Sequence, residues 1–541
     1  MDNVDSLVKR LEQLDDIGAS LSGERDLDRL LSKILLAAKD ITHADGGTLY
    51  TLAQDRRHLS FRIVRTDSLG IAYGGQDEPP LPAHFKDLPL YLENGHLNDH
   101  MVAAHVALSG QTANIADAYE ERRFDFSGTR RFDAATGYRS TSFLTVPMKN
   151  HEGEVIGVLQ LLNAVDPDTG LVRPFTEGDQ RLAESLASQA AIALTNRLLM
   201  GQLEKLFESF VELIDTAIDE KSPYTGGHCA RVPELTMMLA EAVSSSTEGP
   251  LADFTLTDKD RYELRIAALL HDCGKVTTPV HVVDKATKLE TIFDRIELLA
   301  TRFAALKAQA QADMWRAVAQ GEPEASARMR CDLQCRQLDE DLAFLRHANK
   351  GSERMDDAAV SRVREMAERY RWVDGQGREQ PLLNENEIEN LTIRAGTLTA
   401  AERKIINHHI VATIQMLEKL PWPKHLAHVP EYAGGHHERM DGKGYPRGLT
   451  RDQMSVQARI VGIADIFEAL TAADRPYKDA KPLSEALSIM AHMAATDHID
   501  TDLFELFVRS GVALNYAQAN MAPQHVDAVD LDALFQRSVT P

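Results

Sequence analysis

Histidines gather in this sequence beside acidic residues, and that pairing is suited to metal chemistry. Six of the 20 histidines lie in the segment from His408 to His437, and His228 and His271 precede it. His271 is followed directly by Asp272. Imidazole and carboxylate together suit iron, manganese, zinc or nickel, and one carboxylate can bridge two ions because it has two oxygens. The pattern therefore predicts a binuclear metal centre suited to hydrolysis.

Asp465 is a further candidate ligand, because it lies within an apolar helical pattern. The segment RIVGIADIFEAL spans residues 459–470. Its buried face is marked by Ile460, Ile463, Phe467 and Leu470. A carboxylate beside such a face is costly to bury unless it is paired or bound to metal. We therefore expect Asp465 to bind a metal ion.

The first 200 residues alternate between helical and strand patterns. Apolar residues recur at helical spacing in residues 1–24 and 27–41. Strand-like runs occupy residues 46–53, 59–65, 142–148 and 155–162. Thr176, with Asp179 three residues later, predicts the start of a long helix. Strands bracketed by helices predict an α+β domain.

The segment 199–220 carries a regular apolar repeat. Its apolar positions step by four and three residues in turn: Leu199, Leu203, Leu206, Phe210, Leu213 and Ala217. This is the a/d spacing of a two-stranded coiled coil, so we expect a helical linker that forms a parallel homodimer. The alternative is a helix that packs onto its own domain.

A pair of apolar helical stripes interrupts the histidine-bearing part of the chain. The first stripe runs through Ile296, Leu299, Phe303, Leu306 and Ala310, and the second through Leu338, Leu342 and Leu345. Gly321 and Pro323 separate them. We expect a helical hairpin, inserted at about residues 291–396 into an otherwise helical domain.

Composition and charge exclude several classes of protein. The 541 residues carry a net charge of −23, so the chain will not gather a nucleic acid polymer by bulk electrostatics. Four cysteines are too few for a disulfide scaffold, which favours the reducing cytoplasm. The acidic N-terminus is unlike a signal peptide, and no apolar run is long enough for a membrane span. We expect a soluble, cytoplasmic protein.

The first domain resembles a GAF domain. The resemblance rests on QLLNA (residues 160–164), PFTEGD (174–179) and ALTNRLL (193–199). It implies a regulatory α+β domain over residues 25–200, preceded by an N-terminal helix at 1–24. GAF domains are known both as small-ligand pockets and as dimerising spacers.

The second domain resembles the HD-GYP family, metal-dependent phosphodiesterases of the all-α HD superfamily that hydrolyse cyclic di-GMP. Four motifs carry the resemblance in the expected order: PYTGGHCARV (223–232), ALLHDCGK (268–275), HHERMDGKGYPRGL (436–449) and ADIFEALTAADRPYK (464–478). The resemblance implies an HD-GYP domain over residues 210–520, followed by a C-terminal tail at 521–541.

The resemblance also implies a ligand set for two divalent ions per chain. Carried over motif by motif, the first ion takes His228, His271, Asp272 and Asp465, and the second takes Asp272 as the bridge with His409, His436 and His437. His408 is the alternative to His409. Iron or manganese is favoured, with zinc or nickel as alternatives. Members with three ions carry a Glu where this chain has Tyr224, so a third ion is not expected.

The resemblance assigns further residues to catalysis and substrate binding. Asp272 and Lys275 are expected to be catalytic, with Lys275 clamping the phosphate or protonating the leaving oxygen. Arg475 and Lys478 correspond to family residues near the substrate phosphates. The loop residues Gly444, Tyr445 and Pro446 are expected to line the substrate site, to support the histidines before them, or to contact a GGDEF-type partner protein.

These observations together predict a phosphodiesterase that opens cyclic di-GMP to pGpG, and onward to GMP, under the control of a GAF domain. The paired-ion centre is the basis of the predicted reaction class, whereas the substrate comes from the resemblance. One alternative is an HD hydrolase acting on another cyclic dinucleotide or nucleotide. A second alternative is a non-catalytic signalling adaptor.

Overall fold

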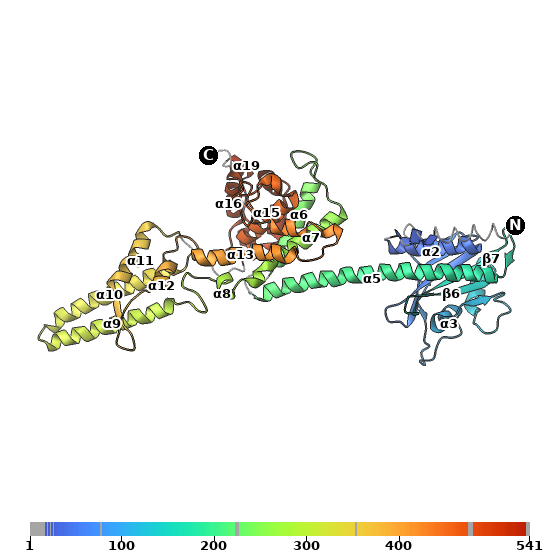
Figure 1. Ribbon diagram of the computed structural model, residues 1–541, viewed down its shortest axis with the longest axis horizontal. Coiled ribbons are helices and arrows are strands. Elements are labelled where there is room, and N and C mark those ends of the chain that lie inside the picture. Colours follow the sequence, from blue (N-terminus) through green and yellow to red (C-terminus); the bar gives the residue numbers. More distant parts are fainter. Residues whose placement is uncertain are drawn as a thin grey trace. The chain divides into compact units, whose positions relative to one another are not determined.

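The chain folds into two compact units, residues Met1–Phe207 and Glu208–Pro541 (Figure 1). The computed structural model describes residues 26–75, 78–221, 227–351, 354–473 and 480–536, together with Ile17, Gly18, Ser20, Leu21, Gly23 and Glu24. Most of the helix expected at residues 1–24 lies outside the described residues. The division between the units falls within one helix, α5 (Glu177–Lys221).

The first unit is built on one antiparallel sheet. Six strands form its main path in the order β3-β2-β1-β7-β6-β5, while β4 pairs with β2 and β8 pairs with β7. The strands are β1 (Ala44–Leu52), β2 (His58–Thr66), β3 (Ile71–Tyr73), β4 (Leu88–Pro89), β5 (Ala113–Ile115), β6 (Phe143–Lys149), β7 (Val155–Val165) and β8 (Val172–Arg173). The four long strands lie where the alternating patterns predicted them, and the four short ones were not predicted.

Helices cover both faces of this sheet, because successive strand residues point to opposite sides. Leu49 and Leu159 face a core formed with α2 (Leu27–Thr42) and the first turns of α5. Their neighbours Tyr50 and Val158 face a second core formed with α3 (Val102–Ser109). A further helix, α4 (Ser127–Thr136), follows α3 in the chain. The expected α+β domain is confirmed.

The start of α5 shows the predicted cap. The Thr176 hydroxyl accepts from the Asp179 backbone N–H at 3.1 Å, and the Asp179 carboxylate accepts from the Thr176 backbone N–H at 2.9 Å. The two residues thus satisfy donors that the first helical turn leaves unpaired. From this cap the helix runs without a break for 45 residues.

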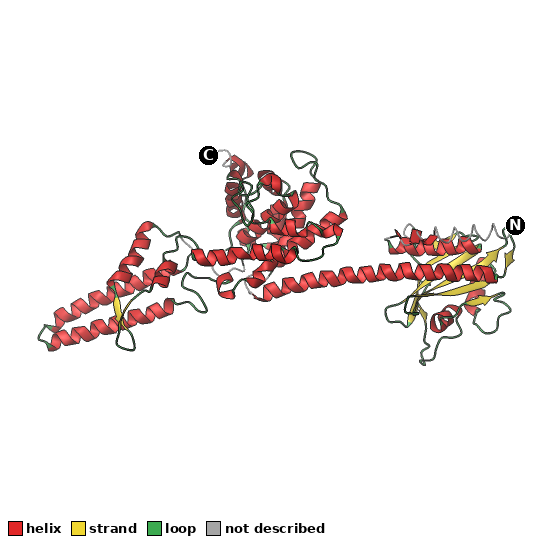
Figure 2. Cartoon of the chain, in the orientation of Figure 1, coloured by secondary structure: helices red, strands yellow, loops and turns green. Residues whose placement is uncertain are grey.

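Among its described residues, the second unit is helical apart from one small hairpin (Figure 2). Its first helices are α6 (His228–Ser244), α7 (Asp258–Leu270), η1 (Cys273–Thr277) and α8 (Val280–Val283). After the inserted segment come α13 (Ala400–Leu417), η2 (Lys424–Leu426), α14 (Val429–Gly434), η3 (Arg451–Gln453) and α15 (Val456–Thr471). The chain ends with α16 (Leu483–Ala495), α17 (Thr501–Arg509), α18 (Val512–Asn520), η4 (Pro523–His525) and α19 (Leu531–Gln536). The expected all-α fold of this part is confirmed.

The inserted segment has its own hydrophobic core. Its elements are α9 (Ile296–Ala319), α10 (Glu324–Asn349), α11 (Asp357–Arg369), β9 (Arg371–Val373), β10 (Glu379–Pro381) and α12 (Glu385–Leu391). Leu299 and Phe303 of α9 pack with Leu338 and Leu345 of α10 in that core, as the two apolar stripes indicated. The β9–β10 hairpin was not predicted.

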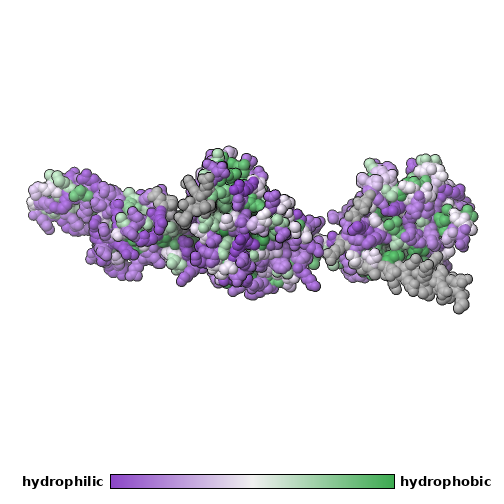
Figure 3. Space-filling view, turned by 90° about the horizontal axis from the view of Figure 1, so that it is seen from above, coloured by the Kyte–Doolittle hydropathy of each residue, from purple (hydrophilic) through white to green (hydrophobic). Residues whose placement is uncertain are grey.

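The outer surface is mainly polar on the face that Figure 3 shows, although apolar patches interrupt it. Among the described residues, no helix combines the length and the hydrophobicity required to cross a lipid bilayer.

Candidate metal centre

Six elements of the second unit bring the predicted ligands together. His228 begins α6, and His271 and Asp272 lie at the junction between α7 and η1. His409 lies in α13, His436 and His437 follow α14, and Asp465 lies in α15. Residues that are more than 200 positions apart in the sequence therefore share one site.

A close approach between η1 and α13 joins the two halves of this site. A Cβ atom on Gly274 would lie 2.0 Å from the His409 carbonyl oxygen and 2.5 Å from the Thr413 backbone nitrogen. The Gly274 N–H donates to the Thr413 hydroxyl at 2.9 Å. Only glycine allows this contact, which holds Asp272 beside His409.

The ligand atoms form two adjacent groups. His228, His271, Asp272 and Asp465 each offer one atom within 4.8 Å of the others, and His409, His436 and His437 do the same. Asp272 lies between the groups. Its Oδ2 is 3.3 Å from His228 Nε2 and 3.1 Å from His271 Nε2, whereas its Oδ1 is 3.2 Å from His409 Nε2. One oxygen of this carboxylate thus faces each group.

Three of the histidines are oriented by the backbone. His271, His409 and His436 each place Nδ1 at 2.5–2.8 Å from the carbonyl oxygen three residues earlier. A carbonyl can only accept, so each Nδ1 carries the proton and donates it. Each Nε2 is then the unprotonated nitrogen that a metal requires, and it faces the centre of the site.

His228 is oriented by a side chain instead. Its Nδ1 lies 2.5 Å from Glu468 Oε2, and Glu468 is nearly fully buried in α15. Arg231, one turn beyond His228, donates to Glu468 Oε1 at 2.8 Å through Nε. This guanidinium compensates the buried carboxylate, which would otherwise be costly to keep charged.

Several buried polar atoms of the site have no hydrogen-bond partner among the described residues. They are His271 Nε2, His436 Nε2 and Asp272 Oδ1. Buried polar groups are almost always paired, so three in one place require an explanation. A divalent cation accepts lone pairs from both atom types, and the donor set therefore fits a metal centre.

The charges of these groups also suit metal binding. Burial opposes ionisation of Asp272, but Lys275 and His271 hold its pKa well below the usual range. Burial lowers the pKa of His437 to about 4. Burial would also lower the pKa of His228, but its hydrogen bonds to Asp272 and Glu468 outweigh this and raise it to about 9, so a metal ion that binds this imidazole must displace a proton. At neutral pH the site thus holds ionised carboxylates, as metal ligands must be.

Lys275 and Tyr445 lie at the edge of the cluster. Lys275 Nζ is 2.6 Å from Asp272 Oδ2. The Tyr445 ring stacks on His437 with centroids 4.9 Å apart and an angle of 18° between the rings. Gly444 allows the loop to approach, because a Cβ there would lie 2.5 Å from Glu438 Cα. Pro446 completes this loop.

Some predicted residues do not enter the described site. Arg475, Lys478 and Tyr224 lie outside the described residues. His408 is exposed on α13, whereas its neighbour His409 is buried in the cluster. Of the two alternatives in the sequence, the structure therefore brings His409 to the site.

Sequence reasoning missed the residues that support the ligands. Glu468 lies three residues after Asp465 on the same helix, and Arg231 lies three residues after His228, so helical spacing could have suggested both. Glu438 was also missed. Its carboxylate accepts from the backbone N–H of Arg447 at 2.7 Å and of Leu449 at 2.9 Å, which ties the loop after His437 to that histidine.

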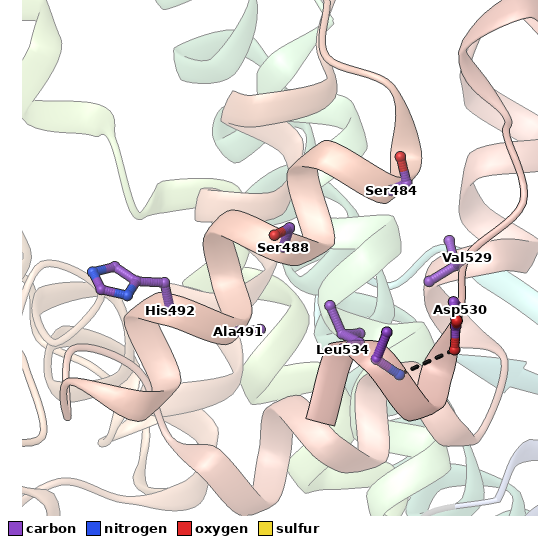
Figure 4. Close-up of a pocket in the computed structure, with 8 residues that line it drawn as sticks. Ser484, Ser488, Ala491, His492, Val529, Asp530 and Leu534 are labelled. Carbon is purple, nitrogen blue, oxygen red and sulfur yellow. Dashed lines mark hydrogen bonds between the residues drawn. The ribbon is translucent and has the colours of Figure 1, made fainter. Parts of the chain in front are cut away.

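A separate pocket lies elsewhere in the second unit. Figure 4 shows it between Ser484, Ser488 and His492 of α16 and the C-terminal residues Val529, Asp530 and Leu534. Its volume is about 350 Å³. None of the predicted site residues lines it, so it has no part in the metal centre.

Comparison with protein families identifies both parts of the chain. A GAF domain model matches residues 26–194, and two HD domain models match residues 225–348 and 385–503. The chain thus contains a segment that matches GAF domains, followed by two segments that match HD domains. HD domains are metal-dependent, which agrees with the donor set described above.

Known proteins that resemble the chain include phosphodiesterases. The 3'3'-cGAMP-specific phosphodiesterase 1 of Vibrio cholerae serotype O1 is 44% identical over 94 residues, which are 17% of this chain and 21% of that protein. The cyclic di-GMP phosphodiesterase of Thermotoga maritima is 39% identical over 98 residues, 18% of this chain and 26% of that protein. The chain thus spans about a quarter or less of the length of these relatives.

Solved structures also resemble the chain. The crystal structure of a GAF domain/HD domain protein from Geobacter sulfurreducens is 18% identical. The match covers 33% of this chain and 98% of that one, with a TM-score of 0.23. This likeness has no bearing on function.

Proposed function

We propose that this protein is a metal-dependent phosphodiesterase of the HD-GYP type. It hydrolyses cyclic di-GMP to the linear dinucleotide pGpG, and a second cleavage gives GMP. The observation that supports this most is the position of Asp272, which presents one carboxylate oxygen to each of two buried ligand groups. Such an arrangement suits two ions that share one bridging ligand.

Two divalent ions, iron or manganese, would be held by these groups. His228, His271 and Asp465 would hold one ion, His409, His436 and His437 would hold the other, and Asp272 would contribute to both. Divalent ions in such a site supply a nucleophile at neutral pH and neutralise the phosphodiester charge. This local positive charge also allows an anionic substrate to approach a chain whose net charge is −23.

The protein's own residues bind and orient the substrate. Lys275 presents its ammonium group beside Asp272, where it holds a non-bridging phosphate oxygen and stabilises charge as the bond breaks. Tyr445, stacked on His437, forms a wall against which a base can lie. Gly444 and Pro446, on either side of Tyr445, keep its ring beside His437. Arg475 and Lys478 follow α15 in the chain and serve as further phosphate contacts.

Hydrolysis of 3'3'-cGAMP is the second candidate, because a relative with 44% identity carries that activity in its name. A non-catalytic adaptor is a third candidate, but the complete set of ligands argues against it. The exposed Lys443 in the loop before Tyr445 supports a further role for that loop as a contact for a GGDEF-type protein.

The GAF domain regulates this activity in a homodimer. The coiled-coil positions Leu199, Leu203, Leu206, Phe210 and Leu213 of α5 are 51–66% exposed in the single chain. This exposure favours the dimer over the alternative, in which the helix packs onto its own domain. A second copy of the same helix would cover them at the a/d spacing of a parallel coiled coil.

The proposed function is tested by anaerobic purification, elemental analysis and turnover of cyclic di-GMP, 3'3'-cGAMP and other cyclic dinucleotides. We expect two iron or manganese ions per chain and the highest kcat/KM for cyclic di-GMP. Asp272→Ala should abolish activity and metal binding together. His409→Ala should do the same, whereas the matched control His408→Ala should change neither. Fewer than two ions per chain and no turnover would favour the adaptor.

A further inference from the structure

The last residue of α5 contacts the segment that carries Lys275. Lys221 Nζ donates to the main-chain carbonyl oxygen of Lys275 at 3.2 Å and to that of Val276. Both residues belong to η1. The Lys275 carbonyl oxygen also accepts from the Thr278 backbone N–H at 3.0 Å. A cation beside the carbonyl end of a helix is favourable.

The opposite side of η1 is held by α13. Gly274 lies against the His409 carbonyl oxygen, and its N–H donates to the Thr413 hydroxyl. The five residues of η1 are therefore held from two sides, by a ligand-bearing helix and by Lys221. The position of the Lys275 side chain relative to Asp272 depends on both contacts.

The end of α5 also contacts the start of α6. The Asp219 carboxylate accepts from the Gly227 backbone N–H at 3.3 Å. Gly227 directly precedes His228 in the sequence. The final turns of α5 thus contact the backbone of η1 and the residue before His228, although they supply no candidate ligand.

We propose that Lys221 is a positioning residue for Lys275, and that α5 transmits the state of the GAF domain to the site through this contact. The proposal rests on the proposed function. It follows from the continuity of α5, whose first turns form part of the GAF core and whose last residue binds the carbonyls of η1. Rotation or displacement of α5 would move these carbonyls, and Lys275 with them.

The first test removes the contact in the full-length protein. Lys221→Met keeps the length of the side chain and removes its donors, and Lys205→Met, at an exposed position of the same helix, is the matched control. We expect Lys221→Met to lower kcat about tenfold, with KM changed less than twofold and metal content unchanged. Lys221→Arg should restore most of the lost kcat. Wild-type kcat in Lys221→Met would overturn the proposal.

Amide hydrogen exchange provides a measurement that does not depend on turnover. In Lys221→Met, we expect faster exchange in the peptide that spans Cys273–Thr277 and unchanged exchange across α13. If Lys221→Met does not fold, Lys221→Gln, whose shorter side chain cannot reach both carbonyls, replaces it. Unchanged exchange in η1 would refute the positioning role. If the wild-type protein hydrolyses no phosphodiester, but Lys221→Met still exchanges faster than wild type in η1, the proposed function alone is refuted.

The second test changes the phase of α5. One alanine inserted after Met200 rotates the rest of the helix by about 100° relative to the GAF domain, and seven inserted residues restore the phase to within about 20°. We expect the single insertion to change kcat at least fivefold and the seven-residue insertion less than twofold. Combined with Lys221→Met, the single insertion should have less than a twofold effect. If the single insertion changes kcat equally in the wild-type and Lys221→Met backgrounds, transmission through this contact is refuted.

Discussion

Replacement of Gly274 by alanine tests the packing that assembles the metal centre. The added Cβ would lie 2.0 Å from the His409 carbonyl oxygen and 2.7 Å from the Thr413 hydroxyl oxygen. The nearest atom belongs to the backbone of α13, so it cannot rotate away as the end of a side chain could. The η1 helix must therefore move from α13 by more than about 1 Å to restore an ordinary contact distance.

This displacement would separate Asp272 from His409, which are now 3.2 Å apart between Oδ1 and Nε2. A misplacement of about 1 Å at a reacting centre can cost about a hundredfold in rate. We expect Gly274→Ala to lower kcat by about that factor and to weaken metal binding. Overpacking costs about 1–3 kcal/mol, so the melting temperature should fall by a few degrees.

The assay combines elemental analysis, thermal melting with and without added metal, and turnover of a chromogenic phosphodiester. Gly375→Ala is the matched control, because a Cβ there meets no atom within 4 Å. It should leave all three measurements at wild-type values. If Gly274→Ala keeps wild-type metal content and turnover, the close packing of η1 on α13 does not form the site.

Glu468→Gln should weaken metal binding about 10- to 100-fold in chelator competition, because the carboxylate that orients His228 is lost; unchanged affinity would contradict that role. The pKa of Glu402 is lowered by its bond to Lys285 and by its capping contacts, although burial opposes the shift. Its stabilisation is therefore present above its usual pKa near 4.5 and is lost as pH falls through the lower folded value. The melting-temperature gap between wild type and Glu402→Gln should accordingly narrow from pH 6 to pH 3, and a constant gap would refute this. Leu206→Glu should reduce the mass measured by light scattering from a dimer to the 60.0 kDa monomer, whereas a monomeric wild type would refute the coiled coil.

Local sequence patterns predicted the fold class of both domains. The alternation of Leu49 and Tyr50, and of Val158 and Leu159, indicates a strand buried on both faces without reference to any other part of the chain. The short strands were missed because two or three residues show no measurable period. The helical stripes of α9 and α10 were recognised for the same local reason.

The sequence by itself determined which residue types could bind metal, since an imidazole or a carboxylate is a ligand wherever it lies. It also determined the helices that carry His409 and Asp465, because helical periodicity is encoded within one or two turns. Only the tertiary structure decided which of His408 and His409 is turned inward, and that Glu468 orients His228 across 240 positions of sequence. Those choices depend on how η1, α13 and α15 pack together, and packing between distant segments has no period that a single sequence can display.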